Sequence, residues 1–380
     1  MFRKIFKKVI VIFVIMMLGG LGGIIASRYF FPYLTSTRLF SKYEFLKKSF
    51  EEVTIINKTE QVFVKEETSI EKIANQASAS VVNIVSIPQK NYGANKNIFK
   101  NGTGLIVTSD GMIITYAEAI IFGDAKYKVL TFDGASYEAE FLGLDSYSNL
   151  AFLKISASNL PVAAFGNSDD TISGEKIITI GNNYGSYDNL YGAGLLRSFN
   201  PVFNLAGKTV SSSEKLEGTF ETDFNSGSNF VGGPIVDYAG RVIGITGSLE
   251  IDGGHYYFQI PANKVKKVID RAIRKELEKN PYLGIYYVPL STTFILANDL
   301  NVNRGAMIYS SSGQQGLAVI AGSPAQKAGL MVGDVIMAIN NQEINSKNTL
   351  SDVLYQYKKG DEIELAILRN KQEIKIKIRL

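Results

Sequence analysis

The chain has 380 residues, which suggests two or three domains, and its 46% hydrophobic and 20% charged residues are ordinary values for globular proteins. A formal net charge of +4 is small for this length, so it argues for neither a nucleic-acid-binding protein nor an enzyme that acts on acidic substrates. The absence of cysteine excludes disulfide bonds, thiolate zinc sites and cysteine nucleophiles, and neither a metal nor a cofactor is expected.

An apolar segment follows a basic N-terminal tip. Four Lys and Arg residues within positions 3–8 precede the apolar run 9–26, which as a helix would span about 27 Å at ~1.5 Å per residue. This length just crosses the hydrocarbon core of a bilayer, and the basic flank predicts a cytoplasmic N-terminus. Residues 1–28 are therefore expected to be a single-pass anchor in the cell membrane, with the bulk of the chain outside the cytoplasm. The alternative is a cleaved signal peptide.

Residues 29–67 are expected to form a stalk or linker. Leu39, Tyr43, Leu46 and Phe50 recur at spacings of four, three and four, which places them on one face of an amphipathic helix. That face either packs against a second subunit or lies on the following domain, and the pattern does not decide between the two.

Short β-strands dominate residues 68–280. The run 102–115 contains two apolar segments around Asp110-Gly111, the pattern of a β-hairpin with a tight turn. Further short apolar runs follow at regular spacing with glycine-rich turns, which predicts an all-β barrel or sandwich. Apolar residues at helical spacing then predict an amphipathic helix over 262–279, at the exit from this region.

Three motifs in this region are similar to those of HtrA (Deg) proteases. Residues 102–115 resemble G-S-G-x-I-I-x-x-D-G-Y-I-L-T, and residues 145–155 resemble D-x-x-x-D-L-A-V-L-K-I. Residues 222–236 resemble the nucleophile loop T-D-x-x-x-N-x-G-N-S-G-G-P-L/I-V. The resemblance continues in order over about residues 68–275, and it implies a trypsin-like double β-barrel.

The resemblance places the three catalytic positions of the family on residues that cannot perform the chemistry. Glu118 occupies the histidine position, Asn149 the position of the orienting aspartate, and Val231 the nucleophile position. A valine has no proton to lose and no lone pair with which to attack a carbonyl. Because a serine triad needs all three partners, we expect a pseudoprotease with no catalytic residue.

Any proteolytic activity without the triad would have to come from other residues near the nucleophile loop. Asn229 replaces a glycine two positions before the nucleophile, and a left-handed backbone there would be costly for a non-glycine residue. The alternative function is a serine-type endopeptidase with a rearranged active site, in which Ser226 or Ser228 attacks and Glu118 acts as the base. The one histidine, His255, lies before the last strand, and the resemblance gives it no route to the nucleophile position.

The last hundred residues or so carry a second set of motifs. Residues 323–336 read S-P-A-Q-K-A-G-L-M-V-G-D-V-I and resemble the S-P-A-x-x-A-G-L-x-x-G-D-x-I run of bacterial PDZ domains. By this resemblance, backbone amides of a loop hold the carboxylate of a peptide or protein C-terminus, and the peptide pairs with the following strand. The alternative is a groove covered by the neighbouring domain. The expected peptide-binding residues are Tyr282, Leu283, Gly284 and Ile285 in the loop, with Leu350, Val353 and Leu354 on a helix at about residues 349–357.

The expected fold is therefore mainly β: a trypsin-like double β-barrel (68–280) followed by a PDZ domain (281–380), after an N-terminal transmembrane helix and a stalk. The expected function is that of a membrane-anchored extracytoplasmic HtrA-like protein, proteolytically inactive, that binds peptides or protein C-termini as a scaffold or regulator in protein quality control. Because family members are often trimeric through the protease domain, the resemblance also implies a homotrimer or a mixed oligomer with active relatives. No nucleic-acid partner is expected.

Overall fold

The chain divides into two compact units, Met1–Val64 and Lys65–Leu380. The computed structural model describes residues 2–26, 66–89, 99–184, 186–207, 210–224, 227–298, 300 and 302–380. The first unit contains helix α1 (Phe2–Ile25). In the described part of the chain, no helix has the length and apolarity needed to cross a membrane, so the expected transmembrane segment is not confirmed. The stalk helix expected within residues 29–67 lies outside the described residues.

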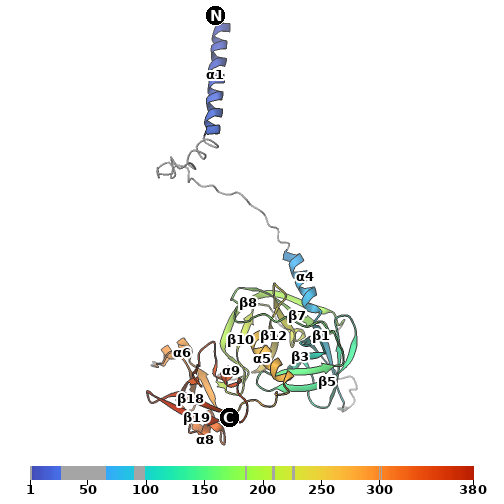
Figure 1. Ribbon diagram of the computed structural model, residues 1–380, viewed down its shortest axis with the longest axis vertical. Helices are drawn as coiled ribbons and strands as arrows, with labels where there is room; N and C mark the ends of the chain where they lie inside the picture. Colours follow the sequence, from blue (N-terminus) through green and yellow to red (C-terminus); the bar gives the residue numbers. More distant parts are fainter. Residues whose placement is uncertain are drawn as a thin grey trace. The chain divides into compact units, whose positions relative to one another are not determined.

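The second unit begins with helix α4 (Glu66–Ser78), which leads into a closed antiparallel barrel with strand order β1-β2-β3-β6-β5-β4 (Figure 1). The predicted hairpin is confirmed: β2 pairs with β3 through a turn in which Gly111 has a φ of +99°. The 3-10 turn η2 (Ala117–Ala119) follows β3. The strands are β1 (Val81–Pro88), β2 (Lys100–Ile106), β3 (Met112–Tyr116), β4 (Ala125–Leu130), β5 (Ser136–Asp145) and β6 (Leu150–Ile155).

A second closed barrel has strand order β10-β13-β12-β11-β7-β8, and the two barrels together confirm the predicted double β-barrel. The barrels share one hydrophobic cluster, in which the rings of Tyr116 and Phe258 form a T-shaped contact at a centroid distance of 5.9 Å. The 3-10 turn η3 (Ser228–Phe230) connects β10 to β11. The strands are β7 (Lys176–Asn182), β8 (Asn189–Asn204), β10 (Glu217–Thr222), β11 (Pro234–Asp237), β12 (Val242–Ile251) and β13 (Gly254–Pro261).

Helix α5 (Ala262–Ile273) leaves the second barrel and buries Val265 and Val268 against it. The helix is shorter than the predicted 262–279. It ends where Lys275 adopts a φ of +56°, a left-handed conformation that does not continue a right-handed helix. Leu277 is nevertheless buried, because the chain folds back onto the barrel core after the turn.

The C-terminal domain is built on a sheet with strand order β19-β18-β16-β15-β14-β9, with β17 paired to β16. The edge strand β9 (Ser211–Ser212) belongs to the double-barrel domain, so one sheet joins the two domains. Figure 1 shows the strands of the C-terminal domain in orange to red. Its elements are β14 (Tyr286–Pro289), α6 (Thr292–Ala297), β15 (Ala306–Ile308), α7 (Gln315–Ala318), α8 (Pro324–Lys327), β16 (Val335–Ile339), β17 (Gln342–Glu343), α9 (Leu350–Leu354), β18 (Glu362–Arg369) and β19 (Gln372–Arg379).

Candidate functional site

Val231 lies between η3 and β11, where the loop meets the first barrel, and its side chain is only 3% exposed. Gly232 follows with a φ of +85°, and a Cβ atom there would lie 2.2 Å from the Thr103 carbonyl oxygen. Gly233 is equally confined, since its Cβ atom would lie 2.1 Å from the Ile180 carbonyl oxygen. Backbone packing alone therefore requires both glycines, whether or not the loop is catalytic.

The backbone amides of this loop are already paired. The Val231 N–H donates to the Ser228 carbonyl at 3.2 Å, and the Gly232 N–H donates to the Thr246 carbonyl at 2.8 Å. An oxyanion hole needs N–H groups aimed at the substrate oxygen, so this arrangement does not offer the Val231 amide for that role. The expected left-handed strain at Asn229 is wrong: this residue is part of η3 and is not among the described residues with positive φ.

Glu118 lies on η2, directly after β3, with an exposed side chain. Loss of water around its carboxyl raises the pKa of Glu118, while the ammonium groups of Lys100 and Lys215 act in the opposite direction. Desolvation also lowers the pKa of both lysines, and the charge of Glu118 counters that effect. One carboxyl and two ammonium groups thus border the position at which the resemblance places a histidine.

Asn149 occupies the turn between β5 and β6 with a φ of +58°. Its side-chain amide donates to the Tyr116 hydroxyl at 3.4 Å, and its Oδ1 accepts from Lys215 Nζ at 3.3 Å. Its carbonyl accepts from the Ala117 N–H at 2.9 Å, which ties the turn to η2. The side chain at the position where the resemblance expects the orienting aspartate is therefore engaged with a phenol and an ammonium group.

Glu118 and Val231 both line one cavity of about 660 Å³. The structure thus brings two of the three expected catalytic positions to the same cleft, whereas Asn149, which is also described, is not part of the lining. The polar side chains of Ser248 and Tyr184 share the cavity with these residues. Val231, where the resemblance places a nucleophile, has only methyl groups, which cannot attack a carbonyl.

His255 also lines this cavity, and it lies within β13 rather than before the last strand as expected. His255 is an exposed residue of β13, and Tyr257, two positions further on, lines the same cavity. Alternate residues of a strand point to the same face, and this alternation is the signal that would have placed the histidine. Ser228 lines the cavity as well, and Ser226 lies outside the described residues.

A second candidate site is the loop that precedes β14 in the C-terminal domain. Gly284 has a φ of +82°, and a Cβ atom there would lie 2.3 Å from Ser323 Cβ, so only glycine fits. The Leu283 and Gly284 N–H groups both donate to Glu214 Oε1, at 3.1 and 2.9 Å. The next amide, that of Ile285, donates to Ser213 Oγ at 3.0 Å. The loop therefore binds a carboxylate, and that carboxylate comes from the double-barrel domain.

The remaining expected peptide-binding residues are divided between core and surface. Leu350, Val353 and Leu354 of α9 are buried in the hydrophobic cluster of the C-terminal domain, whereas Tyr282 is 37% exposed. Helix α9 also faces the double-barrel domain, because its Asp352 accepts hydrogen bonds from Tyr147 Oη at 2.8 Å and from Lys264 Nζ at 2.6 Å.

Comparison with protein families matches two domains. Residues 102–245 match the family described as trypsin-like peptidase domain, and residues 281–380 match the PDZ domain family. The chain is 31% identical over 280 residues to a probable periplasmic serine endoprotease DegP-like of Chlamydia muridarum, which covers 73% of this chain and 53% of the relative. It is 30% identical to the serine protease Do-like HtrA of Bacillus subtilis, over 74% of this chain and 62% of the relative.

Solved structures show the same fold. An HtrA-type protease AlgW with tripeptide matches with a TM-score of 0.64 and 24% identity, over 81% of this chain and 95% of that one. The serine endoprotease from Yersinia pestis matches with a TM-score of 0.56 and 23% identity, over 81% of this chain and 96% of that one. The chain spans about half the length of the first curated relatives that it matches.

Proposed function

Because a domain that matches trypsin-like peptidases precedes a PDZ domain and the chain is similar to HtrA-type proteases, we propose that it is a binding member of the HtrA family and does not cleave its partners. The observation that carries this proposal is Val231: its side chain has no nucleophilic atom, and its amide donates to the Ser228 carbonyl. Glu118 and Asn149 extend the same argument to the other two catalytic positions.

The proposed ligands are peptides or protein C-termini, bound through the PDZ domain. The support is the loop Leu283–Ile285, whose successive amides already hold a carboxylate group. Relatives named as periplasmic serine endoproteases suggest a role in protein quality control outside the cytoplasm, as a scaffold or as a regulator of active proteases. A homotrimer or a mixed oligomer with active relatives belongs to the same proposal, and co-purification with an active relative tests it against a lone monomer.

Two assays on the full chain test this function. Binding is measured by fluorescence polarisation with labelled decapeptides whose last four residues are randomised, once with a free terminal carboxylate and once with a terminal amide. We expect binding of the free-carboxylate pool only. Cleavage is measured with casein and fluorogenic peptides, and we expect no turnover. Equal binding of both pools would reject the role of the PDZ domain in C-terminus recognition.

The second candidate function is that of a serine-type endopeptidase with a rearranged active site. It is favoured by the observation that Ser228 and His255 line the same cavity. A fluorophosphonate probe that labels Ser228 or Ser226 would support it, and labelling should then disappear in Ser228→Ala or Ser226→Ala. The absence of labelling in the intact chain would count against this candidate.

A further inference from the structure

Residues Ser211–Glu214 of the double-barrel domain lie along β14 as a bound peptide would. Ser212 and Ser211 pair antiparallel with Tyr286 and Tyr287 as strand β9. Ser213 continues the pairing, since its N–H donates to the Ile285 carbonyl at 3.1 Å. The chain thus runs toward the loop before β14, and Glu214 reaches the loop last.

Glu214 supplies at the loop the group that a chain end would supply. Its Oε1 accepts from the amides of Leu283 and Gly284, at 3.1 and 2.9 Å. Neighbouring hydroxyls add to this, because Ser213 Oγ donates to Oε1 at 2.6 Å and Ser212 Oγ donates to Oε2 at 3.0 Å. A carboxylate on successive amides, preceded by residues paired with the next strand, is the arrangement by which strand addition captures a C-terminus.

Cavities lie at both ends of the Ser211–Glu214 segment, and a bound C-terminal peptide could fill them. Next to Glu214 lies a cavity of about 330 Å³, lined by Ser213 and Glu214 from one domain and by Tyr282, Ser351 and Tyr355 from the other. A terminal residue whose side chain entered this cavity would contact the aromatic rings of Tyr282 and Tyr355.

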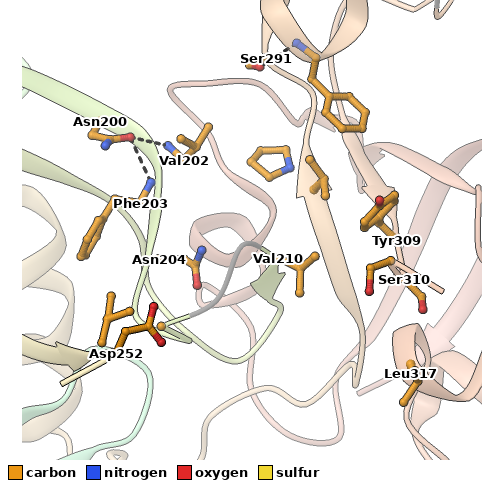
Figure 2. A pocket seen from close by; sticks show the side chains of 16 residues that line it. Asn200, Val202, Phe203, Asn204, Val210, Asp252, Ser291, Tyr309, Ser310 and Leu317 are labelled. Carbon is orange, nitrogen blue, oxygen red and sulfur yellow. Dashed lines mark hydrogen bonds between the residues drawn. The ribbon is translucent and has the colours of Figure 1, made fainter. Parts of the chain in front are cut away.

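A larger cavity of about 920 Å³ begins at Val210, directly before Ser211 (Figure 2). Figure 2 shows Val210 and Tyr309 on its walls, and the two residues of β14 that β9 does not pair with, Val288 and Pro289, also line it. The residues that precede the last four of a longer peptide would run along this cavity.

From these contacts we infer that Ser211–Glu214 is an internal occupant of the PDZ groove, with the Glu214 carboxylate in the place of a terminal carboxylate, and that a free protein C-terminus binds only by displacing it. This inference rests on the proposed function, because it describes how the same groove is regulated. The apparent affinity for a free C-terminus is then the intrinsic affinity multiplied by the fraction of molecules whose groove is vacant.

The first test compares Glu214→Ala with a matched variant, Glu138→Ala, an exposed glutamate of β5. The free-carboxylate decapeptide pool is titrated against the full chain by fluorescence polarisation. Glu214→Ala should bind at least about tenfold more tightly than the unaltered chain, and Glu138→Ala should bind like it. Equal affinities for all three chains would overturn the internal occupant while leaving peptide binding by the PDZ domain intact.

A second test uses the absence of cysteine from the chain. Ser212 and Tyr286 are direct cross-strand partners, so the double variant Ser212→Cys, Tyr286→Cys places two thiols at disulfide distance. Oxidised protein should lose peptide binding by at least about tenfold, and reduction of the same sample should restore it. Peptide binding that is equally strong in the oxidised, cross-linked state would overturn the inference.

Hydrogen–deuterium exchange separates this inference from the proposed function if no chain binds any peptide. The amides of Leu283–Ile285 should exchange slowly in the unaltered chain and in Glu138→Ala, and faster in Glu214→Ala, with unchanged exchange in β18 and β19. Equal exchange at the loop in all three chains would overturn the internal occupant, whatever the outcome of the peptide titration.

Discussion

The Tyr287 hydroxyl donates a 2.8 Å hydrogen bond to the Glu217 carboxyl, which joins β14 of the C-terminal domain to β10 of the second barrel. Glu217 is fully buried, and Ser211 of β9 donates to its other oxygen. Burial raises the pKa of Glu217 to about 7. The negative charge of Asp352 also raises this pKa, whereas the hydrogen bonds from Ser211 and Tyr287 and the positive charge of Lys264 lower it. A titrating carboxyl thus accepts a hydrogen bond from Ser211, the first residue of the segment inferred to occupy the PDZ groove.

This carboxyl predicts a pH-dependent free energy of unfolding. The folded pKa of about 7 lies above the ordinary value of 4.5, so the folded state holds the proton more tightly than the unfolded state. The stabilising effect is complete below the unfolded pKa and is lost as the pH rises to the folded pKa, by at most about 3 kcal/mol. Urea unfolding at a series of pH values should show this loss, reduced in Glu217→Gln and retained in Glu138→Gln. The same slope in Glu217→Gln as in the unaltered chain would show that Glu217 is not its source.

A glycine substitution tests the packing of the Val231 loop. In Gly232→Ala the new methyl group meets the Thr103 carbonyl oxygen at 2.2 Å, in a backbone with a φ of +85°. We expect a loss of more than about 2 kcal/mol in the free energy of unfolding, from the clash and the left-handed backbone together. Gly227→Ala is the matched control, because no atom lies within 4 Å of its new Cβ. Equal urea midpoints for the two variants would contradict the packing described for Gly232.

The ion pair between Lys264 of α5 and Asp352 of α9 joins the two domains with an N–O distance of 2.6 Å and side chains that are 12% and 11% exposed. Lys264→Ala leaves the Asp352 carboxylate with its Tyr147 and Thr349 hydroxyl partners but without a countercharge. We expect a loss of about 3 kcal/mol in the free energy of unfolding, measured in urea. Lys267→Ala, at an exposed position of the same helix, should change it by less than about 0.5 kcal/mol. Similar losses in the two lysine variants would indicate that the pair contributes little.

Replacing the valine alone should not create a protease. In Val231→Ser the new hydroxyl has Glu118 and Asn149 where the resemblance expects a histidine and an aspartate, and the amide of residue 231 donates to the Ser228 carbonyl as in the unaltered chain. A triad without its base and with a closed oxyanion hole has little power, so casein digestion should stay at background. The measurement is release of labelled casein fragments, with the double variant Val231→Ser, Ser228→Ala as control. If Val231→Ser digests casein and the double variant does so too, the new serine is the nucleophile and the surrounding site still supports catalysis.

Much of the fold could be predicted because its motifs are local. The hairpin around Gly111 and the tight Gly232-Gly233 pair both leave short patterns of glycine and apolar residues in the sequence. Each pattern has a physical cause in the structure: Gly111 and Gly232 have positive φ values, and Gly233 has no room for a Cβ atom. The HtrA-like motifs also singled out Glu118 and Val231 in the sequence, and in the structure both residues line the same cleft.

The contacts between the domains could not be predicted in the same way. Strand β9 consists of Ser211 and Ser212, which show no apolar alternation, and it exists because β14 offers it backbone partners. The Glu214 contact likewise depends on where the two domains meet. His255 is different: strand alternation with Tyr257 was available in the sequence, and only the barrel shows that this face of β13 lines the cleft.

We expect that the cleft around Val231 does not cleave peptide bonds. The most direct measurement is mass spectrometry of casein incubated with the purified full chain, alongside the variants Ser228→Ala and His255→Ala. We predict intact casein in all three samples. Casein fragments made by the unaltered chain and missing from either variant would contradict the account and identify the residue that performs the reaction.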